Sequence, residues 1–447
     1  MSYSNLHSNK PFERASKTAH TNIINDLDVQ RFLASCRFPP VVDEIDKSDM
    51  SVQILNETTK NPVKYIFTID GGYTNEIVRP QFPSATFAFF QFGALCFTYK
   101  DLVEIEHKPF IDPSDMSKLQ RIQRFKLALP TKGIMLKSEK DFVSSVRKTI
   151  YDFFVNQPED GGLASALEWL LFEKYDDSAN ATKWTLASCP VCGQKDVEIE
   201  HATISKEYKF LCTSHSCKSE LYLTDVFRLH EVVDNELGAG GILGYLTTVI
   251  EQMIIVYLVK QMLAIKGDLL KETLFVKDGP LAFFGQTANM HKPMRKLIGY
   301  LQKRHDIFLV GVEKSGSFVE HAAQVLQQFS KNQYMVLGNS YIYKYIIPAI
   351  SEENEPYAST SYYGHKVLFK SKDDNMYVAT IPCPELLVEP RASDLRNVEA
   401  ILHNLAALKC DLYANPLMPV VLANKLVSLA AHPSSDLLRA FVQNTLG

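Results

Sequence analysis

Two aspartates in this chain have a setting that suits metal-dependent chemistry. Asp70 ends the apolar run YIFTID, Asp278 ends LFVKD, and a glycine follows each of them. A strand that ends in Asp-Gly projects a carboxylate from a rigid sheet, and the glycine lets a metal or a substrate approach the backbone. Carboxylates on two adjacent strands can hold hard cations in the arrangement that hydrolyses phosphodiesters. A single Asp-Gly is more often an ordinary turn, so the hypothesis depends on the pair.

A third carboxylate ligand is left open between two glutamates. Glu251 has apolar neighbours on a helical segment, where a buried carboxylate is costly unless cations compensate it. Glu272 lies six residues before Asp278, and an even spacing places both on one face of a strand. We prefer Glu251. Asp225 and Glu231 are weaker rivals, because their segment is expected to be a helix that the aspartate caps.

Lys314 follows a predicted strand in the run GVEKSG. From such a turn it could contact a phosphate as a point charge, or it could be an ordinary solvated lysine. His365 begins a predicted hairpin and is expected to be structural. The glycine run at 238–241 lacks the Lys-Ser/Thr of a phosphate-binding P-loop, so we expect a loop that leads into a helix.

Half of the eight cysteines follow a zinc-ribbon pattern. The four predicted ligands are Cys189, Cys192, Cys212 and Cys217. Each close pair lies on a tight turn, Gly193 allows the chain to fold back, and four thiolates complete a tetrahedron around zinc. Such a closed site leaves no position for water, so the zinc is expected to be structural. A ligand role for His215 in place of Cys217, and four thiols without metal, remain as alternatives.

The elements that must position these residues alternate between strands and helices. The expected strands are 65–70, which runs into a tight turn, 85–99 antiparallel to it, 272–278, 306–313, and a hairpin of 361–370 with 376–382. The expected helices are 26–35, 115–127, 139–156, 164–173, 242–265, 291–304, 317–330, 391–408 and 416–430. This alternation predicts an α/β fold with a mixed sheet.

Bulk composition indicates an ordinary folded chain. The 447 residues are 46% hydrophobic and 22% charged, with a net charge of −4. The charge weakly disfavours nucleic-acid binding, although a local basic groove would not show in it. The N-terminus has no apolar secretory segment, and the apolar stretch 242–265 carries too many polar residues to span a bilayer. We therefore predict a cytoplasmic protein without a membrane partner, and a buried amphipathic helix at 242–265.

Once these motifs are placed in order, the chain resembles the NurA nuclease family. FTIDGGYTN around Asp70 and LFVKDGPLAFF around Asp278 are similar to the first and last acidic motifs of that family, and Glu251 lies on the helix before the second. GVEKSG, the run 365–385 and the run 415–429 resemble its lysine turn, late hairpin and C-terminal helix. The resemblance spans about 65 to 430, with the zinc ribbon as an insertion.

The resemblance implies an RNase H-like mixed sheet flanked by helices. It also implies Mn²⁺ or Mg²⁺ bound by Asp70, Glu251 and Asp278, with Lys314 at the phosphate. The expected activity is single-strand endonuclease and 5′-end exonuclease action on DNA, by a homodimer that works with a hexameric HerA-type ATPase. One departure is Asn424, which stands where the family has histidine after alanine. Another is Phe369, in place of the usual hairpin tyrosine.

We divide the chain into four parts: an N-terminal arm (1–60), the first part of the nuclease core (61–180), the zinc-ribbon insertion (185–222), and the second part of the core with the C-terminal helices (223–447). The leading hypothesis is a metal-dependent DNA nuclease for DNA end processing or anti-phage defence. The first alternative is a catalytically weakened adaptor that binds DNA or a translocase through its ribbon, which Asn424 favours. A zinc-ribbon transcription or replication factor is the third.

Overall fold

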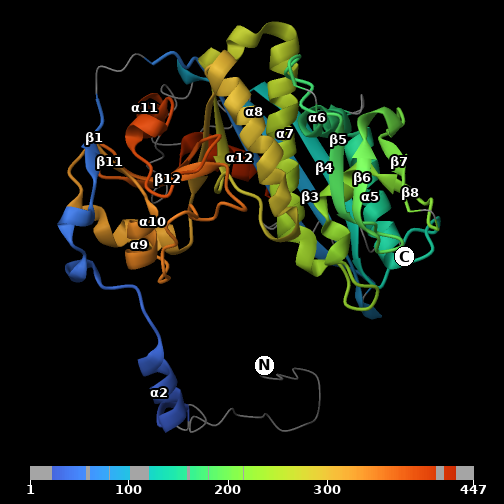
Figure 1. The fold of residues 1–447 in the computed structure, drawn as a ribbon, viewed down its shortest axis with the longest axis horizontal. Helices are drawn as coiled ribbons and strands as arrows, with labels where there is room; N and C mark the ends of the chain where they lie inside the picture. The colour runs from blue at the N-terminus through green and yellow to red at the C-terminus, as the bar shows by residue number, and fades with distance from the viewer. Residues whose placement is uncertain are drawn as a thin grey trace.

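The computed structural model describes residues 23–56, 61–79, 81–100, 120–158, 162–179, 181–214, 216–408 and 417–428. Its centre is a mixed sheet of nine strands in the order β1-β11-β12-β13-β10-β9-β2-β3-β4 (Figure 1). These strands are β1 (Val52–Ile54), β2 (Tyr65–Arg79), β3 (Phe82–Thr98), β4 (Gln120–Lys132), β9 (Thr273–Asp278), β10 (Phe308–Glu313), β11 (Gln333–Val336), β12 (Gly364–Lys370) and β13 (Met376–Pro382).

Five adjacent strands form an RNase H-like core. β2, β3 and β4 are antiparallel neighbours, β9 runs parallel to β2, and β10 runs parallel to β9. Three antiparallel strands followed by two parallel ones is the order of an RNase H-like sheet, so the predicted fold class is confirmed. The predicted hairpin is also present as β12 and β13, and β13 joins it antiparallel to β10.

Helices cover both faces of this sheet. The described α-helices are α2 (Leu27–Ser35), α5 (Phe142–Asn156), α6 (Gly162–Leu171), α7 (Leu243–Lys266), α8 (His291–Arg304), α9 (Ser317–Val325), α10 (Asn339–Tyr345), α11 (Val398–Ala407) and α12 (Met418–Val427). In β2, Phe67 and Ile69 pack with α5 to α8, whereas Ile66 packs with α11 and α12. Side chains alternate along a strand, so these residues lie on opposite faces of the sheet. We call the face that contacts α5 to α8 the α7 face and the one that contacts α11 and α12 the α12 face.

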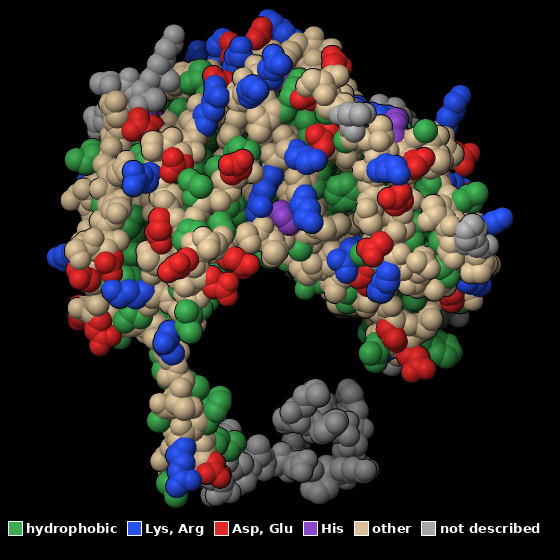
Figure 2. Space-filling model, in the orientation of Figure 1, with side chains coloured by type: hydrophobic (Ala, Val, Ile, Leu, Met, Phe, Trp, Pro, Cys, Tyr) green, Lys and Arg blue, Asp and Glu red, His purple; other side chains and the backbone are tan. Residues whose placement is uncertain are grey.

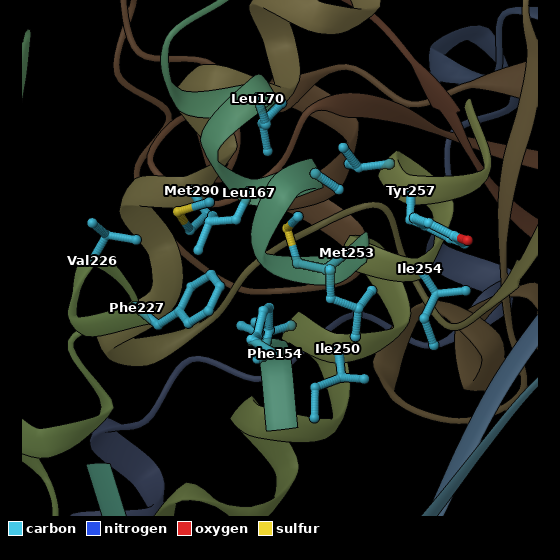
Figure 3. Packing of buried hydrophobic residues seen from close by; sticks show 14 of the residues in the cluster. Phe154, Leu167, Leu170, Val226, Phe227, Ile250, Met253, Ile254, Tyr257 and Met290 are labelled. Carbon is cyan, nitrogen blue, oxygen red and sulfur yellow. The ribbon is translucent and has the colours of Figure 1, made fainter. Parts of the chain in front are cut away.

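Helix α7 is the central element of the α7 face. Every residue from Val249 to Val259 is buried, and Figure 3 shows Ile250, Met253 and Ile254 packed among side chains of neighbouring elements. The expected buried helix is confirmed, but it is not amphipathic over this stretch, because neighbours surround it on all sides. Among the described residues, one segment, Gly240–Glu272, is long and apolar enough to span a membrane by composition, and 78% of its apolar window is buried inside the protein.

The turn expected after Asp70 is also wrong. Strand β2 continues through Gly71 and Gly72, in unbroken register with β3. A Cβ atom at Gly71 would lie 2.4 Å from the ring of Phe92, so this glycine serves close packing in the sheet. The expected antiparallel pairing of the two strands is confirmed, but the chain reverses several residues later.

The helix expected at 115–127 is wrong over 120–127, which belongs to β4, while 115–119 lies outside the described residues. Phe125 and Leu127 are buried and Arg124 and Lys126 are exposed, so this charged segment has the two-residue period of a half-exposed strand. The expected helices at 317–330 and 391–408 are shorter, as α9 and α11. Three further elements were not predicted from the sequence: strands β1 and β11 and helix α10.

Two small hairpins lie beside α5 and α6. They are β5 (Lys183–Ser188) with β6 (Lys195–Glu200), and β7 (Lys209–Leu211) with β8 (Glu220–Tyr222). Their apolar residues Val197, Ile199 and Phe210 belong to the same buried cluster as α7. The two hairpins therefore pack on the main core.

The N-terminal arm contributes to the sheet at one end and projects from the body at the other. Strand β1 pairs antiparallel with β11 at the edge of the sheet. Helix α2 has no buried residue and extends away from the rest of the protein (Figure 1). Its predicted bounds are confirmed to within one residue, and Asp26 caps it by accepting hydrogen bonds from the backbone N–H groups of Asp28 and Val29.

Candidate functional site

Asp70 and Asp278 meet where the parallel pair of strands stops. β2 and β9 are paired from Tyr65–Thr273 to Ile69–Lys277, and the two aspartates are the next residue on each strand. Both have the parity of the α12 face. The Asp70 side chain is buried and accepts a hydrogen bond from the Gly71 N–H at 2.8 Å, whereas the Asp278 carboxylate is 22% exposed. The structure thus brings together the two residues that the sequence paired.

Lys314 and Asn424 complete the α12 face of this site. The Lys314 ammonium donates to Asp278 Oδ2 at 2.7 Å. With its amide turned to satisfy both neighbours, Asn424 on α12 donates to Asp70 Oδ2 at 2.7 Å and accepts from Lys314 Nζ at 2.5 Å. The four side chains therefore form one chain of hydrogen bonds, from Asp70 through Asn424 and Lys314 to Asp278.

Glu251 approaches the same strand ends from the α7 face. Its carboxylate is buried and pairs with the buried Lys277 ammonium at 2.9 Å. Lys277 also donates to the backbone oxygen of Asp278 at 2.6 Å. A Cβ atom at Gly71 would lie 3.3 Å from Glu251 Oε1, so the bare backbone of this glycine lets the glutamate reach the sheet.

Negative charge is crowded at this site. Burial raises the pKa of Asp70 to about 8, and the nearby Asp278 and Glu251 carboxylates add to the rise, while Lys314 opposes it. Burial also raises the pKa of Glu251, and the Lys277 ammonium acts in the opposite direction. Three acidic groups therefore face two lysines, and Asp70 is the group that remains uncompensated.

The donor chemistry of these acids fits a hard divalent cation, because all three offer carboxylate oxygens and their excess charge would be neutralised by it. Their spacing is that of ion pairs. Among the described residues, the cysteine cluster is the one group of three or more potential metal ligands whose ligand atoms all lie within 4.8 Å of one another. Asp70, Glu251 and Asp278 do not meet that condition, and two of them have a lysine partner instead: Lys277 for Glu251 and Lys314 for Asp278.

The rival carboxylates lie elsewhere or have other partners. Glu272 precedes β9, at the end opposite to Asp278, and pairs with Lys64 at 2.6 Å. Asp225 is buried in a two-bond pair with Arg147 and also accepts from the Tyr222 N–H, which is a capping role.

The remaining rival and the candidate histidine also have structural roles. Glu231 pairs with Arg228 and accepts a hydrogen bond from the Ser188 hydroxyl of β5. His365 is buried, and its Nε2 accepts from the Leu387 N–H at 3.1 Å. Burial lowers the pKa of His365 to about 4, as expected for a structural histidine that stays neutral.

A buried network holds the turn that carries Lys314. Glu313, the last residue of β10, forms an ion pair with the buried Lys366 of β12. The Lys366 ammonium also lies over the rings of Phe318 and Tyr362, at 4.3 and 4.7 Å from their centres. These contacts join the strand, the turn and the start of α9, so the position of Lys314 is set by packed elements on both sides.

The cysteine cluster occupies the turns of the two small hairpins. Cys189 and Cys192 lie in the β5–β6 turn, and Cys212 and Cys217 lie in the β7–β8 turn. All four Sγ atoms are within 4.8 Å of one another. Gly193 has φ of 73°, which lets its N–H fold back onto the Cys189 carbonyl at 2.9 Å.

Four soft donors at this spacing fit a tetrahedral zinc ion, and the arrangement is compatible with a zinc ribbon. Four sulfur ligands would complete the tetrahedron, so no coordination position would be left for water or a substrate. The alternative ligand His215 lies outside the described residues.

Sequence reasoning missed Lys277, the buried partner of Glu251. The signal was available, because a lysine inside the otherwise apolar run LFVKD must find a partner when the strand is buried. Asn424 was singled out only as a departure from the family. Its contact with both Asp70 and Lys314 depends on how α12 crosses the sheet, which no local pattern reports.

No family model matches this sequence, and no curated protein matches it. Among solved structures, the NurA nuclease from Sulfolobus solfataricus is 8% identical, with 97% of this chain and 98% of that chain covered and a TM-score of 0.36. A second structure described as NurA is 12% identical over 95% and 96% of the two chains, with a TM-score of 0.29. A third, NurA with manganese, is 10% identical over 96% and 93%, with a TM-score of 0.26. Likenesses at this level assign no function.

Proposed function

We propose that this protein is a divalent-metal-dependent nuclease that hydrolyses phosphodiester bonds in DNA. The observation that carries the proposal is the convergence of Asp70 and Asp278 at the end of the parallel strand pair, with Glu251 behind the same point. The raised pKa of Asp70 supports it, because a charge-crowded carboxylate at a sheet end gains from a bound cation. The sequence motifs around both aspartates, which resemble those of NurA nucleases, support it independently.

Each side chain has a role that its contacts allow. Asp70 and Asp278 would hold Mn²⁺ or Mg²⁺, with Glu251 as the third ligand. When bound, such ions neutralise phosphate oxygens and lower the pKa of water. Lys314 lies at the partly exposed end of the site and would turn from Asp278 toward a phosphate oxygen. Asn424 orients the Asp70 carboxylate by donating to one of its oxygens.

Cleavage of labelled single-stranded DNA in Mn²⁺ tests this proposal. Asp70→Asn and Asp278→Asn keep shape and remove the charge, and each is expected to lower the cleavage rate by about a thousandfold or more, as expected for loss of metal-borne transition-state stabilisation. Glu272→Gln is the matched control, because it removes an acid that lies just before β9, at the end opposite to Asp278. Wild-type rates in both aspartate variants, with circular dichroism unchanged, would disprove the assignment.

The finer proposals concern substrate and partners. We infer a single-strand endonuclease and 5′-end exonuclease that forms a homodimer in the cytoplasm and works with a hexameric HerA-type ATPase, in DNA end processing or defence. The resemblance of the sequence motifs supports them. Sedimentation of the purified protein, alone and mixed with a HerA-type ATPase, tests the dimer and the partner. A monomer that does not co-sediment with the ATPase would remove both.

A specific observation favours the alternative adaptor function. Both lysines of the site are already paired with its acids, and Asn424 stands where the related motif has histidine. In an adaptor these contacts would be permanent ion pairs, and DNA would bind without being cut. A gel-shift assay and a cleavage assay on the same DNA with Mn²⁺ separate the two functions, since an adaptor gives a shift and no products.

A further inference from the structure

Beyond Asp70, the α12 face of the sheet continues across β2, β3 and β4. The paired rows that follow are Asp70–Gly93–Arg124, Gly72–Gln91–Lys126, Thr74–Phe89–Ala128 and Glu76–Phe87–Pro130. Helix α12 borders this area, because the Val427 carbonyl lies 3.3 Å from where a Cβ of Gly72 would be. Along β3, the rows from Gln91 to Phe87 extend for about 13 Å, at 3.3 Å per strand residue.

Two kinds of side chain dominate the β3 and β4 part of this area. Phe87 and Phe89 are half-buried and lie edge to face, with ring centres 4.6 Å apart. Arg124 and Lys126 are exposed on the adjacent strand, in the rows nearest to Asp70. We call these four residues the β3–β4 surface. Moving away from the carboxylates, the order is therefore basic residues first and aromatic rings second.

This order matches the chemistry of a nucleic-acid strand. A guanidinium and an ammonium attract phosphates, and partly exposed rings stack on bases of any sequence. Phe87 and Phe89 form one contacting pair of partly accessible rings, rather than a single scattered surface hydrophobe, beside the basic residues of the adjacent strand. A duplex hides its base faces by stacking, so the rings favour a single strand.

We propose that the β3–β4 surface binds single-stranded DNA next to the candidate active site, with phosphates over Arg124 and Lys126 and bases on Phe89 and Phe87. The proposal deepens the proposed nuclease function and rests on it for the identity of the substrate. It names a binding surface that is separate from the carboxylates, so the two can be tested apart.

The test measures affinity rather than cleavage. The full-length protein in EDTA is titrated against a fluorescent oligothymidine longer than about 16 nucleotides, the upper end of common single-strand site sizes, and anisotropy is read at several salt concentrations. Phe87→Ala with Phe89→Ala is expected to weaken binding by about tenfold or more, since each base loses its stacking partner. Lys126→Gln is expected to reduce the slope of log K against log salt by about 0.7, the value for one phosphate contact to a single strand.

Two matched controls lie on the same strands. Phe82 is 62% exposed at the start of β3, and Lys132 lies at the end of β4 beside Gly238. Phe82→Ala and Lys132→Gln are expected to bind with wild-type affinity and salt slope. Because Lys126 is exposed, its variant keeps the test decisive even where the double phenylalanine variant fails to fold.

The outcomes distinguish the two proposals. Wild-type affinity and slope in the Phe87/Phe89 and Lys126 variants overturn the surface, whether or not the protein cuts DNA. A wild-type protein that binds but never cleaves in Mn²⁺ removes the nuclease function, while weakened binding in the variants still supports the surface. A wild-type protein that does not bind single-stranded DNA overturns the surface as well.

Discussion

The cysteine cluster and the carboxylate site are two possible metal centres built in opposite ways. In the cluster, four sulfurs from two turns already lie within 4.8 Å of one another. In the carboxylate site, two of the acids are paired with lysines, Asp278 with Lys314 at 2.7 Å and Glu251 with Lys277 at 2.9 Å. The first arrangement is ready for an ion, whereas the second must exchange an ion pair for one.

The two centres should therefore respond differently to metal. A closed structural site adds its binding free energy to folding, so its loss appears as instability. A site whose acids are paired with lysines stays folded without metal, so removing the metal should lower the reaction rate rather than the stability. Lys277 and Lys314 thus act as internal cations in the folded chain.

Removing a cysteine ligand should have the largest effect on stability. A small effect would mean that the two centres do not differ in the way described. Cys189→Ser is expected to abolish zinc binding and to destabilise the hairpin region by several kcal/mol, because structural zinc contributes about 10 kcal/mol in small domains. Elemental analysis and thermal unfolding measure both quantities. Ser216→Ala, between the ligands of the second turn, is the control and should keep its zinc. Full stability in Cys189→Ser would show that the ribbon does not depend on metal.

Removing Lys277 tests whether its ammonium group takes the place of a metal ion beside Glu251. Lys277→Gln leaves the buried Glu251 carboxylate without its partner, and breaking a buried pair costs about 3–5 kcal/mol. Urea unfolding in EDTA measures the loss. Mn²⁺ should recover part of it in the variant and change the wild type less. If added Mn²⁺ has the same effect on both, the ion does not reach Glu251.

The carboxylate site should also make stability depend on pH. The pKa of Asp70 is raised from 3.8 to about 8 in the folded protein, so the unfolded chain releases this proton first and stability falls as pH rises from about 4 to 8. The expected loss in EDTA is a few kcal/mol. Asp70→Asn should flatten this part of the curve, and Mn²⁺ should reduce it. A wild-type curve that is level across this range would contradict the burial of an uncompensated carboxylate.

The smallest expected effect concerns Asn424. Histidine at this position would lie beside Asp70 and Lys314 and could donate a proton, which the asparagine amide cannot do. We expect Asn424→His to raise Mn²⁺-dependent cleavage by about tenfold, with most of the gain near neutral pH. Asn424→Ala serves as the comparison and should not show the gain. A decrease in the histidine variant would mean that the amide is itself the functional group.

The two sites also differ in what the sequence could predict. Cysteine spacing is local, so the clustering of the four cysteines could be predicted from the sequence. The aspartates were predicted because each ends an apolar run, and helices α5, α6 and α8 followed from their periodicity. The strand through Gly71 was missed, because a glycine that packs against Phe92 looks the same in sequence as one in a turn.

Other features depended on contacts between distant segments. The pairing of Glu251 with Lys277, and of Asn424 with Asp70, needs the crossing of α7 and α12 over opposite faces of one sheet. The charged composition of β4 hid its two-residue alternation. Acidic and basic side chains are interspersed on the α7 side of the protein, so the surface in Figure 2 does not by itself mark where a substrate would bind.

Strand β1 has a consequence for how the protein stays in solution. It contributes only three residues, yet it covers β11, which would otherwise end the nine-stranded sheet with open N–H and C=O groups. Open edges invite pairing with another chain, and a very short outer strand is one way in which natural sheets prevent it. Strand β1 should therefore reduce aggregation, and a chain shortened past Ile54 would expose the unpaired edge of β11.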